Sequence, residues 1–196
     1  MAIEVRRVQM LTDDERRILF GWGKGIFGAD SPNLKMRKFK WHVVVYADGR
    51  PVCHVGLCLP AVKVGVRHIG ILQWRPRWLA RWVYRLVNLN VRSFFVIGAG
   101  GMVTPPDEQG QGYAALAGKY ARRFAMDELH VDFSIMFSVD RLQHFHEQNW
   151  GARVIEAPVY LDQPSGKVRC PLNAMVVSLT GKDWPPGIVD IDGLPW

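Results

Sequence analysis

The sequence predicts an α/β fold in which a mixed, mostly antiparallel twisted sheet is flanked by helices. The chain has 196 residues, of which 48% are hydrophobic, so it can bury one full core. Apolar runs of strand length alternate with runs of helical period, in the order β-α-β-β, an insert, and then β-α-β-α-β-β. We therefore expect residues 1–196 to form a single domain.

Two local signals define the elements before the insert. Thr12 followed by Glu15 is a capping box, which opens a helix. Asp48-Gly49 between two apolar runs is a strong hairpin signal. The expected elements are a strand at 2–9, a helix at 13–21, a loop or short helix at 22–40 and two strands within 41–64.

After the insert, apolar runs and helical periods continue to alternate. Glycines within the first of these strands predict a bulge. The expected elements are strands at 94–103, 131–139, 152–161 and 168–179, and helices at 110–128 and 140–149. Residues 181–196 are rich in Pro, Gly and Asp without a regular period, so we expect an irregular tail.

Charge and cysteine usage narrow the function classes. The formal net charge is +7, which favours anionic partners such as nucleotide cofactors, acidic carrier proteins, nucleic acids or anionic membranes. Cys53, Cys58 and Cys170 are odd in number and lack CxxC spacing, which predicts reduced thiols in the cytoplasm and no metal site. No apolar signal segment opens the chain, in agreement with a cytoplasmic protein.

The insert at 70–95 has the pattern of a basic amphipathic helix. Its apolar face is Trp78, Leu79, Trp82, Val83, Leu86 and Val87, and Arg77, Arg81 and Arg85 follow at spacing four. Two interpretations stay open: a cover packed on the sheet, or a docking surface at 75–92 for an acidic acyl carrier protein or an anionic membrane. The stretch matches no nucleic-acid-binding motif, so we do not expect a nucleic-acid partner.

The most informative stretch is Gln109-Gly110-Gln111-Gly112 at the start of a predicted helix. A helix N-terminus presents unpaired N–H groups and the positive end of the helix dipole, and glycines let a ligand approach that backbone. The pattern suits a phosphate. It is not a dinucleotide-binding GxGxxG motif, because position 115 is Ala, and it lacks the Gly-Lys-Ser/Thr of a P-loop.

The segment Gln109-x-x-Gly112-x-Ala114, after an apolar strand, resembles the acyl-CoA-binding motif of the GNAT acyltransferase superfamily. The resemblance implies a GNAT-like fold and acetyl-CoA, or another acyl-CoA, as cosubstrate. It also implies that the cofactor's pyrophosphate lies on main-chain N–H groups, and that a main-chain N–H near Met102 and Val103 polarises the thioester carbonyl. The implied pyrophosphate-binding residues are Gln109, Gly110, Gln111, Gly112, Tyr113 and Ala114.

The following helix resembles the superfamily's Phe-Tyr-Glu-x-x-Gly-Phe segment. His146 takes the position of the tyrosine that protonates the leaving thiolate, which makes it a candidate catalytic acid. Asn149 is expected at the place of the turn glycine, because Asn tolerates the left-handed conformation.

The tail DWPPGIVDIDGLPW resembles the C-terminus of the NodA nodulation N-acyltransferases and, more loosely, that of aminoglycoside 2′-N-acetyltransferases. This resemblance implies that Asp190 and the Trp196 carboxylate bind the acceptor amine. The strand before the glycine loop carries no carboxylate, so Asp192 becomes a candidate catalytic base. The alternative is that Asp190 and Asp192 only stabilise turns, through hydrogen bonds to the nearby main chain.

These features together predict an N-acyltransferase that moves an acyl group, acetyl in the first instance, from acyl-CoA to a primary amine such as that of an amino sugar or aminoglycoside, by direct attack. One alternative is NodA-like transfer of a longer chain from acyl carrier protein or acyl-CoA. Another is a non-catalytic acyl-CoA-binding module. The sequence leaves the oligomeric state open, a homodimer included.

Overall fold

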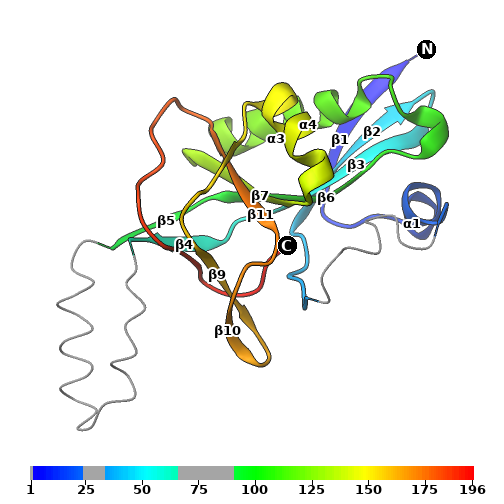
Figure 1. Cartoon of the computed structure of the whole chain (residues 1–196). Coiled ribbons are helices and arrows are strands. Elements are labelled where there is room, and N and C mark those ends of the chain that lie inside the picture. Colours follow the sequence, from blue (N-terminus) through cyan, green and yellow to red (C-terminus); the bar gives the residue numbers. More distant parts are fainter. Residues whose placement is uncertain (1, 24–33, 66–90) are drawn as a thin grey trace, which may run out of the picture.

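The computed structural model describes residues 2–23, 34–65 and 91–196. Its strands and helices form two sheets with helices over one of them (Figure 1). The helices are α1 (Asp13–Phe20), α3 (Tyr113–Asp127) and α4 (Asp140–Trp150). The strands are β1 (Ile3–Val8), β2 (Trp41–Ala47), β3 (Arg50–Cys58), β4 (Ala61–Val64), β5 (Arg92–Phe95), β6 (Ile97–Val103), β7 (Phe133–Ser138), β8 (Arg153–Val154), β9 (Val159–Gln163), β10 (Gly166–Arg169), β11 (Asn173–Ser178) and β12 (Val189–Ile191).

The larger sheet has seven strands in the order β1-β2-β3-β6-β7-β11-β8. All of its neighbours pair antiparallel except β6 and β7, which are parallel. This arrangement confirms the predicted mixed, mostly antiparallel sheet. The predicted hairpin also forms: Asp48 and Gly49 both have positive φ, 48° and 80°, as a tight two-residue turn between twisted strands requires.

The smaller sheet has five strands in the order β10-β9-β12-β4-β5. It grows out of the larger one, because β3 continues into β4 past Pro60 and β5 continues into β6 past Val96. The N–H of Val96 donates to the carbonyl of Pro60 at 3.1 Å, so a hydrogen bond links the two points where the chain passes from one sheet to the other. The expected strand at 94–103 is therefore divided between the two sheets.

The tail prediction is wrong in one respect. Residues 189–191 form strand β12, which pairs antiparallel with β4 and parallel with β9, so the C-terminal segment is part of the second sheet and not an irregular appendage. The end of the predicted helical insert differs too, since Arg92–Phe95 is strand β5. Residues 66–90, which hold most of the amphipathic insert predicted at 70–95, lie outside the described residues, as does 24–33 of the loop or short helix expected at 22–40.

Helices cover both faces of the larger sheet. The capping box of Thr12 and Glu15 forms as expected at the start of α1, which packs over Val44, Tyr46 and Val103. On the other face, α3 buries Ala117, Ala121, Phe124 and Ala125 against β2 and β3. A third apolar cluster fills the space between the two sheets and includes Trp196. No helix in the described part of the chain is long and apolar enough to cross a membrane.

Trp196 should be a main stabilising residue of the C-terminal segment. Its side chain is only 3% exposed, and truncation of a buried tryptophan to alanine costs about 3–5 kcal/mol. We expect Trp196→Ala to lower the free energy of unfolding in urea by that amount. Phe95→Ala, at a ring that is 59% exposed, is the control and should cost far less; equal losses would contradict the placement of Trp196.

Candidate functional site

The larger sheet opens between β6 and β7. These strands pair at only two positions, Ile97 with Ser134 and Gly98 with Ile135. Beyond them, β6 continues along β3 as far as Val103, whereas β7 continues along β11. The facing edges of β6 and β7 therefore have main-chain groups that do not pair across the gap, and such groups readily pair with an extended ligand.

The glycine loop lies between the end of β6 and the start of α3. Gly110 and Gly112 have φ of 77° and 81°, a region that side chains other than those of Gly and Asn rarely adopt. A Cβ at either position would meet no atom within 4 Å, so the loop is open on its outer side. Among the described residues, no main-chain carbonyl accepts from the N–H groups of 110–112. Main-chain N–H groups without a main-chain acceptor, at an open helix N-terminus, are the features that an anion-binding site requires.

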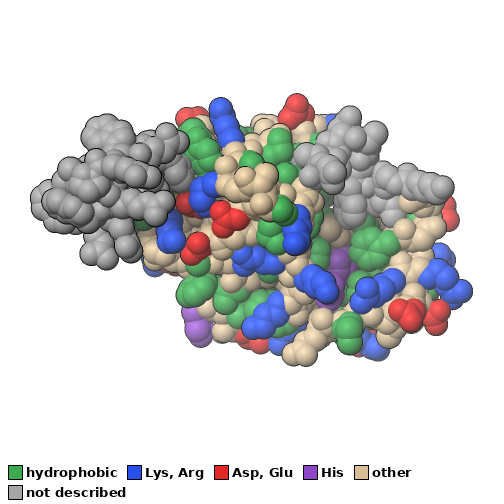
Figure 2. All heavy atoms as spheres, turned by 90° about the horizontal axis from the view of Figure 1, so that it is seen from below, with side chains coloured by type: hydrophobic (Ala, Val, Ile, Leu, Met, Phe, Trp, Pro, Cys, Tyr) green, Lys and Arg blue, Asp and Glu red, His purple; other side chains and the backbone are tan. Residues whose placement is uncertain are grey.

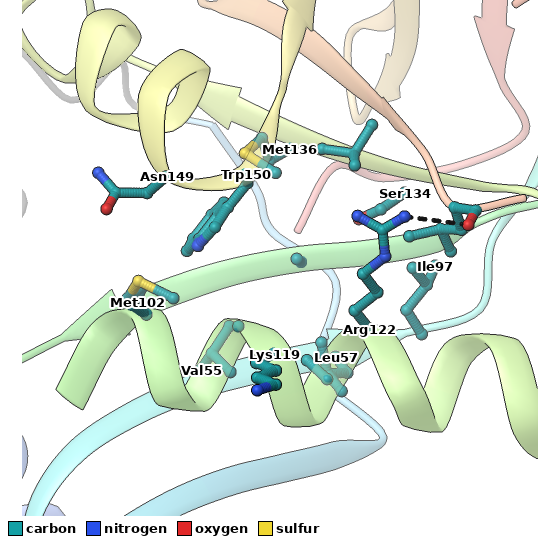
Figure 3. A pocket seen from close by; sticks show the side chains of 16 residues that line it. Val55, Leu57, Ile97, Met102, Lys119, Arg122, Ser134, Met136, Asn149 and Trp150 are labelled. Carbon is teal, nitrogen blue, oxygen red and sulfur yellow. Dashed lines mark hydrogen bonds between the residues drawn. The ribbon is translucent and has the colours of Figure 1, made fainter. Parts of the chain in front are cut away.

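An apolar cavity of about 370 Å³ lies between α3 and the sheet, next to the opening. Its walls come from α3, from the end of α4 and from strands on both sides of the gap (Figure 3). Met102, Asn149 and Trp150 lie toward one end, and Ile97, Ser134 and Arg122 toward the other. The lining residues are Val55, Leu57, Ile97, Ala99, Met102, Ala115, Gly118, Lys119, Ala121, Arg122, Ser134, Met136, Asn149, Trp150, Val177 and Leu179.

Trp196 lies against the opposite face of β6. A Cβ on Gly98 would come within 2.4 Å of the Trp196 ring, and a Cβ on Gly100 within 3.2 Å of its main-chain oxygen. The indole Nε1 donates to the carbonyl of Ile135 on β7 at 3.3 Å. Trp196 therefore spans β6 and β7 where they separate, and the glycines of β6 are needed because the tryptophan lies so close.

Next to it on the same face, two histidines form a hydrogen-bonded pair. Nδ1 of His54 lies 2.8 Å from the carbonyl of Gly101, and Nε2 of His54 lies 2.8 Å from Nδ1 of His42. Burial lowers the pKa of His54 to about 4. Burial, with Arg16 nearby, also lowers the pKa of His42. Both imidazoles are accordingly neutral at pH 7.

The predicted catalytic histidine, His146, lies in α4 and is buried, with a ring that packs on Phe145 and Trp150. Its Nδ1 has no hydrogen-bond partner among the described residues, and burial lowers its pKa. His146 does not line the cavity; Asn149 and Trp150 of the same helix do. The expected role of Asn149 is wrong: the left-handed residue after α4 is Gly151, with φ of 64°.

The structure does not bring the two tail aspartates to the cavity. Asp190 is buried in β12, where Nζ of Lys167 lies 2.5 Å from its carboxylate. Asp192 is half exposed and pairs with Lys63 at 3.2 Å. Ile191, which lies between the two aspartates, belongs to the core between the sheets. Because successive side chains of an extended chain point to opposite faces, the carboxylates of Asp190 and Asp192 lie on the face away from that core. Trp196, by contrast, is at the opening.

No protein-family model and no curated protein matches the chain. Solved structures do match. A protein described as an N-acetyltransferase from Lactobacillus plantarum gives a TM-score of 0.51 at 13% identity, over 91% of this chain and 99% of that one. The GNAT-family protein YhbS of Escherichia coli, in complex with CoA, gives 0.50 at 14% identity, over 100% and 97%. ElaA of Escherichia coli gives 0.50 at 9%, over 90% and 100%. The chain thus has the GNAT fold.

Sequence analysis located the glycine loop, Met102 and Val103, which fall at one end of the opening. It missed the histidine pair, because His42 and His54 are twelve residues apart on two strands and only the hairpin register brings them together. It also missed the cavity, because its walls come from six separate elements. The one available signal for His54 was a titratable residue within the apolar run of β3.

The buried histidine pair should make stability depend on pH. An unfolded histidine has a pKa near 6.5, whereas that of folded His54 is about 4, so protonation favours the unfolded chain. Stability is then fully present above about pH 6.5 and is lost as the pH falls toward 4. At about 1.4 kcal/mol per pKa unit, we expect His54 to contribute a loss of about 3 kcal/mol, measured by urea unfolding between pH 7 and pH 4.

His54→Gln removes the titrating group and should flatten this dependence. His144→Gln, at a side chain that is 76% exposed, should leave it as in the wild type. A wild-type pH dependence that persists unchanged in His54→Gln would show that His54 is not the group responsible.

Proposed function

We propose that this protein is an N-acyltransferase that moves an acyl group from acyl-CoA to a primary amine. The observation that carries the proposal is the juxtaposition of the glycine loop, the opening between β6 and β7, and the apolar cavity. The fold supports it, since YhbS, which shares the fold, is a GNAT-family protein crystallised with CoA. Nothing in the proposal requires a metal; the described residues contain no group of three ligand side chains that could hold one.

Each part of the cofactor has a matching surface. The pyrophosphate suits the N–H groups of 110–112, at the positive end of α3; the N–H of Gln109, also expected to bind it, donates to the carbonyl of Pro106 at 3.2 Å. The arm that follows carries amides, which suit the unpaired main-chain groups of β6 and β7. The thioester would then lie beside the end of β6, where an N–H near Met102 or Val103 polarises its carbonyl. A neutral amine attacks that carbon, and the thiolate leaves as the tetrahedral intermediate collapses.

The cavity favours a longer acyl group over acetyl. A cavity of about 150 Å³ holds one benzene, with six carbons. At that ratio 370 Å³ holds about fifteen carbons, which leaves room for a dodecanoyl chain. Its lining is mostly apolar, with Lys119, Arg122, Ser134 and Asn149 as the polar members. Hydrocarbon needs no hydrogen-bond partner, so a lining of mostly apolar side chains suits an acyl chain. The NodA-like alternative is thus the better supported one, with acyl carrier protein as a second candidate donor.

The acceptor is the least constrained part. We propose that the amine approaches the face of β6 opposite the cavity, past Trp196 and the histidine pair. Figure 2 shows this side of the molecule, where Lys and Arg side chains gather around a histidine. Arg37 lies here and donates to the main-chain carbonyl of Asp192 at 3.1 Å. Such surroundings suit an acceptor with neutral or anionic groups better than a polycationic aminoglycoside.

A charge at the glycine loop should abolish cofactor binding. We expect Gly112→Asp to weaken CoA binding at least tenfold, because its carboxylate would repel the pyrophosphate. Gly112→Asn is the matched control: it has the same size and similar tolerance of positive φ, without the charge, and should bind more tightly than Gly112→Asp. Titration calorimetry with CoA measures both. Equal affinities in the two variants would contradict the assignment, as would a wild type that binds no CoA.

Filling the cavity should change the preferred chain length. Val177 lines it from β11 and is 5% exposed. We expect Val177→Phe to lower kcat/KM for dodecanoyl-CoA at least tenfold, with much less effect on acetyl-CoA, and Val177→Ile to fall between it and the wild type. The readout is CoA release from each donor with an amine panel. Parallel losses with both donors would argue against an acyl-chain cavity.

A further inference from the structure

The histidine pair has a defined proton arrangement. A main-chain carbonyl only accepts hydrogen bonds, so Nδ1 of His54 must carry the proton that it shares with Gly101. Neutral His54 then has its lone pair on Nε2, and Nδ1 of His42 must donate to it. This leaves Nε2 of neutral His42 as the unprotonated nitrogen of the pair, available to accept a proton.

The surroundings fix His54 and leave His42 the more accessible of the two. His54 is 1% exposed and contacts the rings of Phe20 and Phe39, with centroids 5.2 Å and 6.4 Å away. His42 is half-buried, with Phe39 at 6.1 Å. From α1, Arg16 opposes protonation of His42 and Glu15 favours it, but Glu15 is already engaged with Thr12 and the Tyr46 hydroxyl.

The pair is anchored to the strand that would hold the thioester. The register of β3 against β6 shifts between His54 and Gly56, which face Val103 and Gly100. Gly101 and Met102 lie inside this bulge; the Gly101 carbonyl turns to His54, while Met102 lines the cavity on the other face. Trp196 contacts the preceding Gly100. Three consecutive residues of β6 therefore have three roles: Gly100 contacts the tail, Gly101 anchors the histidine pair and Met102 lines the cavity.

We propose that His42 is the general base of the acyl transfer, and that His54 is a positioning residue that fixes its tautomer and orientation; this rests on the proposed function. Nε2 of His42 takes a proton from the acceptor ammonium, directly or through one water. The freed amine attacks the thioester carbonyl, the C–N bond forms and the C–S bond breaks. The thiolate takes up a proton that the nitrogen of the intermediate releases. The proton on His42 passes to solvent, and the sum is amide, free thiol and one proton.

His54 assists without exchanging a proton. When His42 becomes an imidazolium, its Nδ1–H already points at the Nε2 lone pair of His54, so the positive charge gains a charge-assisted hydrogen bond and no tautomer has to change. Since the pKa of His42 lies below its usual range, the base is in its unprotonated form at neutral pH, as a general base must be.

The test compares His42→Gln, His54→Phe and His54→Gln with the wild type and the exposed-histidine control His144→Gln, using dodecanoyl-CoA and glucosamine. We expect His42→Gln to lower kcat about 10²-fold at pH 7. The deficit should shrink as the pH rises, because solvent then deprotonates the amine. His54→Phe should lower kcat about tenfold, and His54→Gln less, since an amide can donate to Gly101 and accept from His42. The proposal is overturned if His42→Gln has the kcat of the wild type, or if its loss of kcat is the same at every pH from 6 to 10.

Two further measurements separate this proposal from the proposed function. Dodecanoyl-CoA should raise the melting temperature of all five proteins equally; no rise in the wild type refutes the acyl-CoA function itself. Nitrogen NMR of the imidazoles needs no acceptor amine. At pH 7 it should show His42 neutral, protonated at Nδ1 and bare at Nε2, with a pKa below 6.5. A charged His42, or one protonated at Nε2, overturns the proposal even if glucosamine is not acylated.

Discussion

The separation of β6 from β7 is the constraint on which the rest of the site depends. A sheet that loses pairing in its centre leaves main-chain groups without partners, and buried groups of this kind are costly unless something else pairs with them. At the last paired position, the Trp196 indole also donates to the carbonyl of Ile135. The main-chain groups of β6 beyond this position do not pair with β7, which makes them candidates to pair with a ligand.

The opening also divides the molecule into two chemically different sides. On the side of α3 the walls are apolar, and the cavity there has few polar groups. On the opposite side lie the histidine pair, the tail and Arg37. The proposed acyl transfer would place the acyl chain of the donor on the first side and the acceptor amine on the second. Strand β6 borders both environments, since Met102 lines the cavity and the carbonyl of Gly101 accepts from His54.

Local rules in the sequence predicted most of the elements. The capping box of Thr12 and Glu15 and the Asp48-Gly49 turn are short-range features with defined geometry, so sequence suffices for them. Strand β12 was missed because three residues within a Pro- and Gly-rich tail carry no readable period, and its pairing with β4 and β9 is long-range. The glycines of β6 were read as a bulge; their second reason, contact with Trp196, depends on a residue that is almost a hundred positions away.

The same limit applies to the candidate acid–base residues, whose surroundings cannot be read from the sequence. His146 was chosen because it falls within a segment that resembles a GNAT motif. The tail aspartates were chosen because the C-terminus resembles that of other acyltransferases. In space, Asp190 and Asp192 are paired with Lys167 and Lys63. His54 and His42 instead contact each other and the rings of Phe20 and Phe39, and Nε2 of His42 is the open nitrogen of the pair.

The position of the tail has a consequence for how acceptor binding is studied. Since β12 pairs with both β4 and β9, and Trp196 closes the opening beside Gly98, removal of residues 190–196 would disturb the second sheet and the donor site together. Loss of activity after such a truncation would therefore not identify an acceptor-binding role. Single substitutions at Asp192, whose side chain is half exposed, separate the two effects, because the pairing of β12 and the packing of Trp196 stay intact.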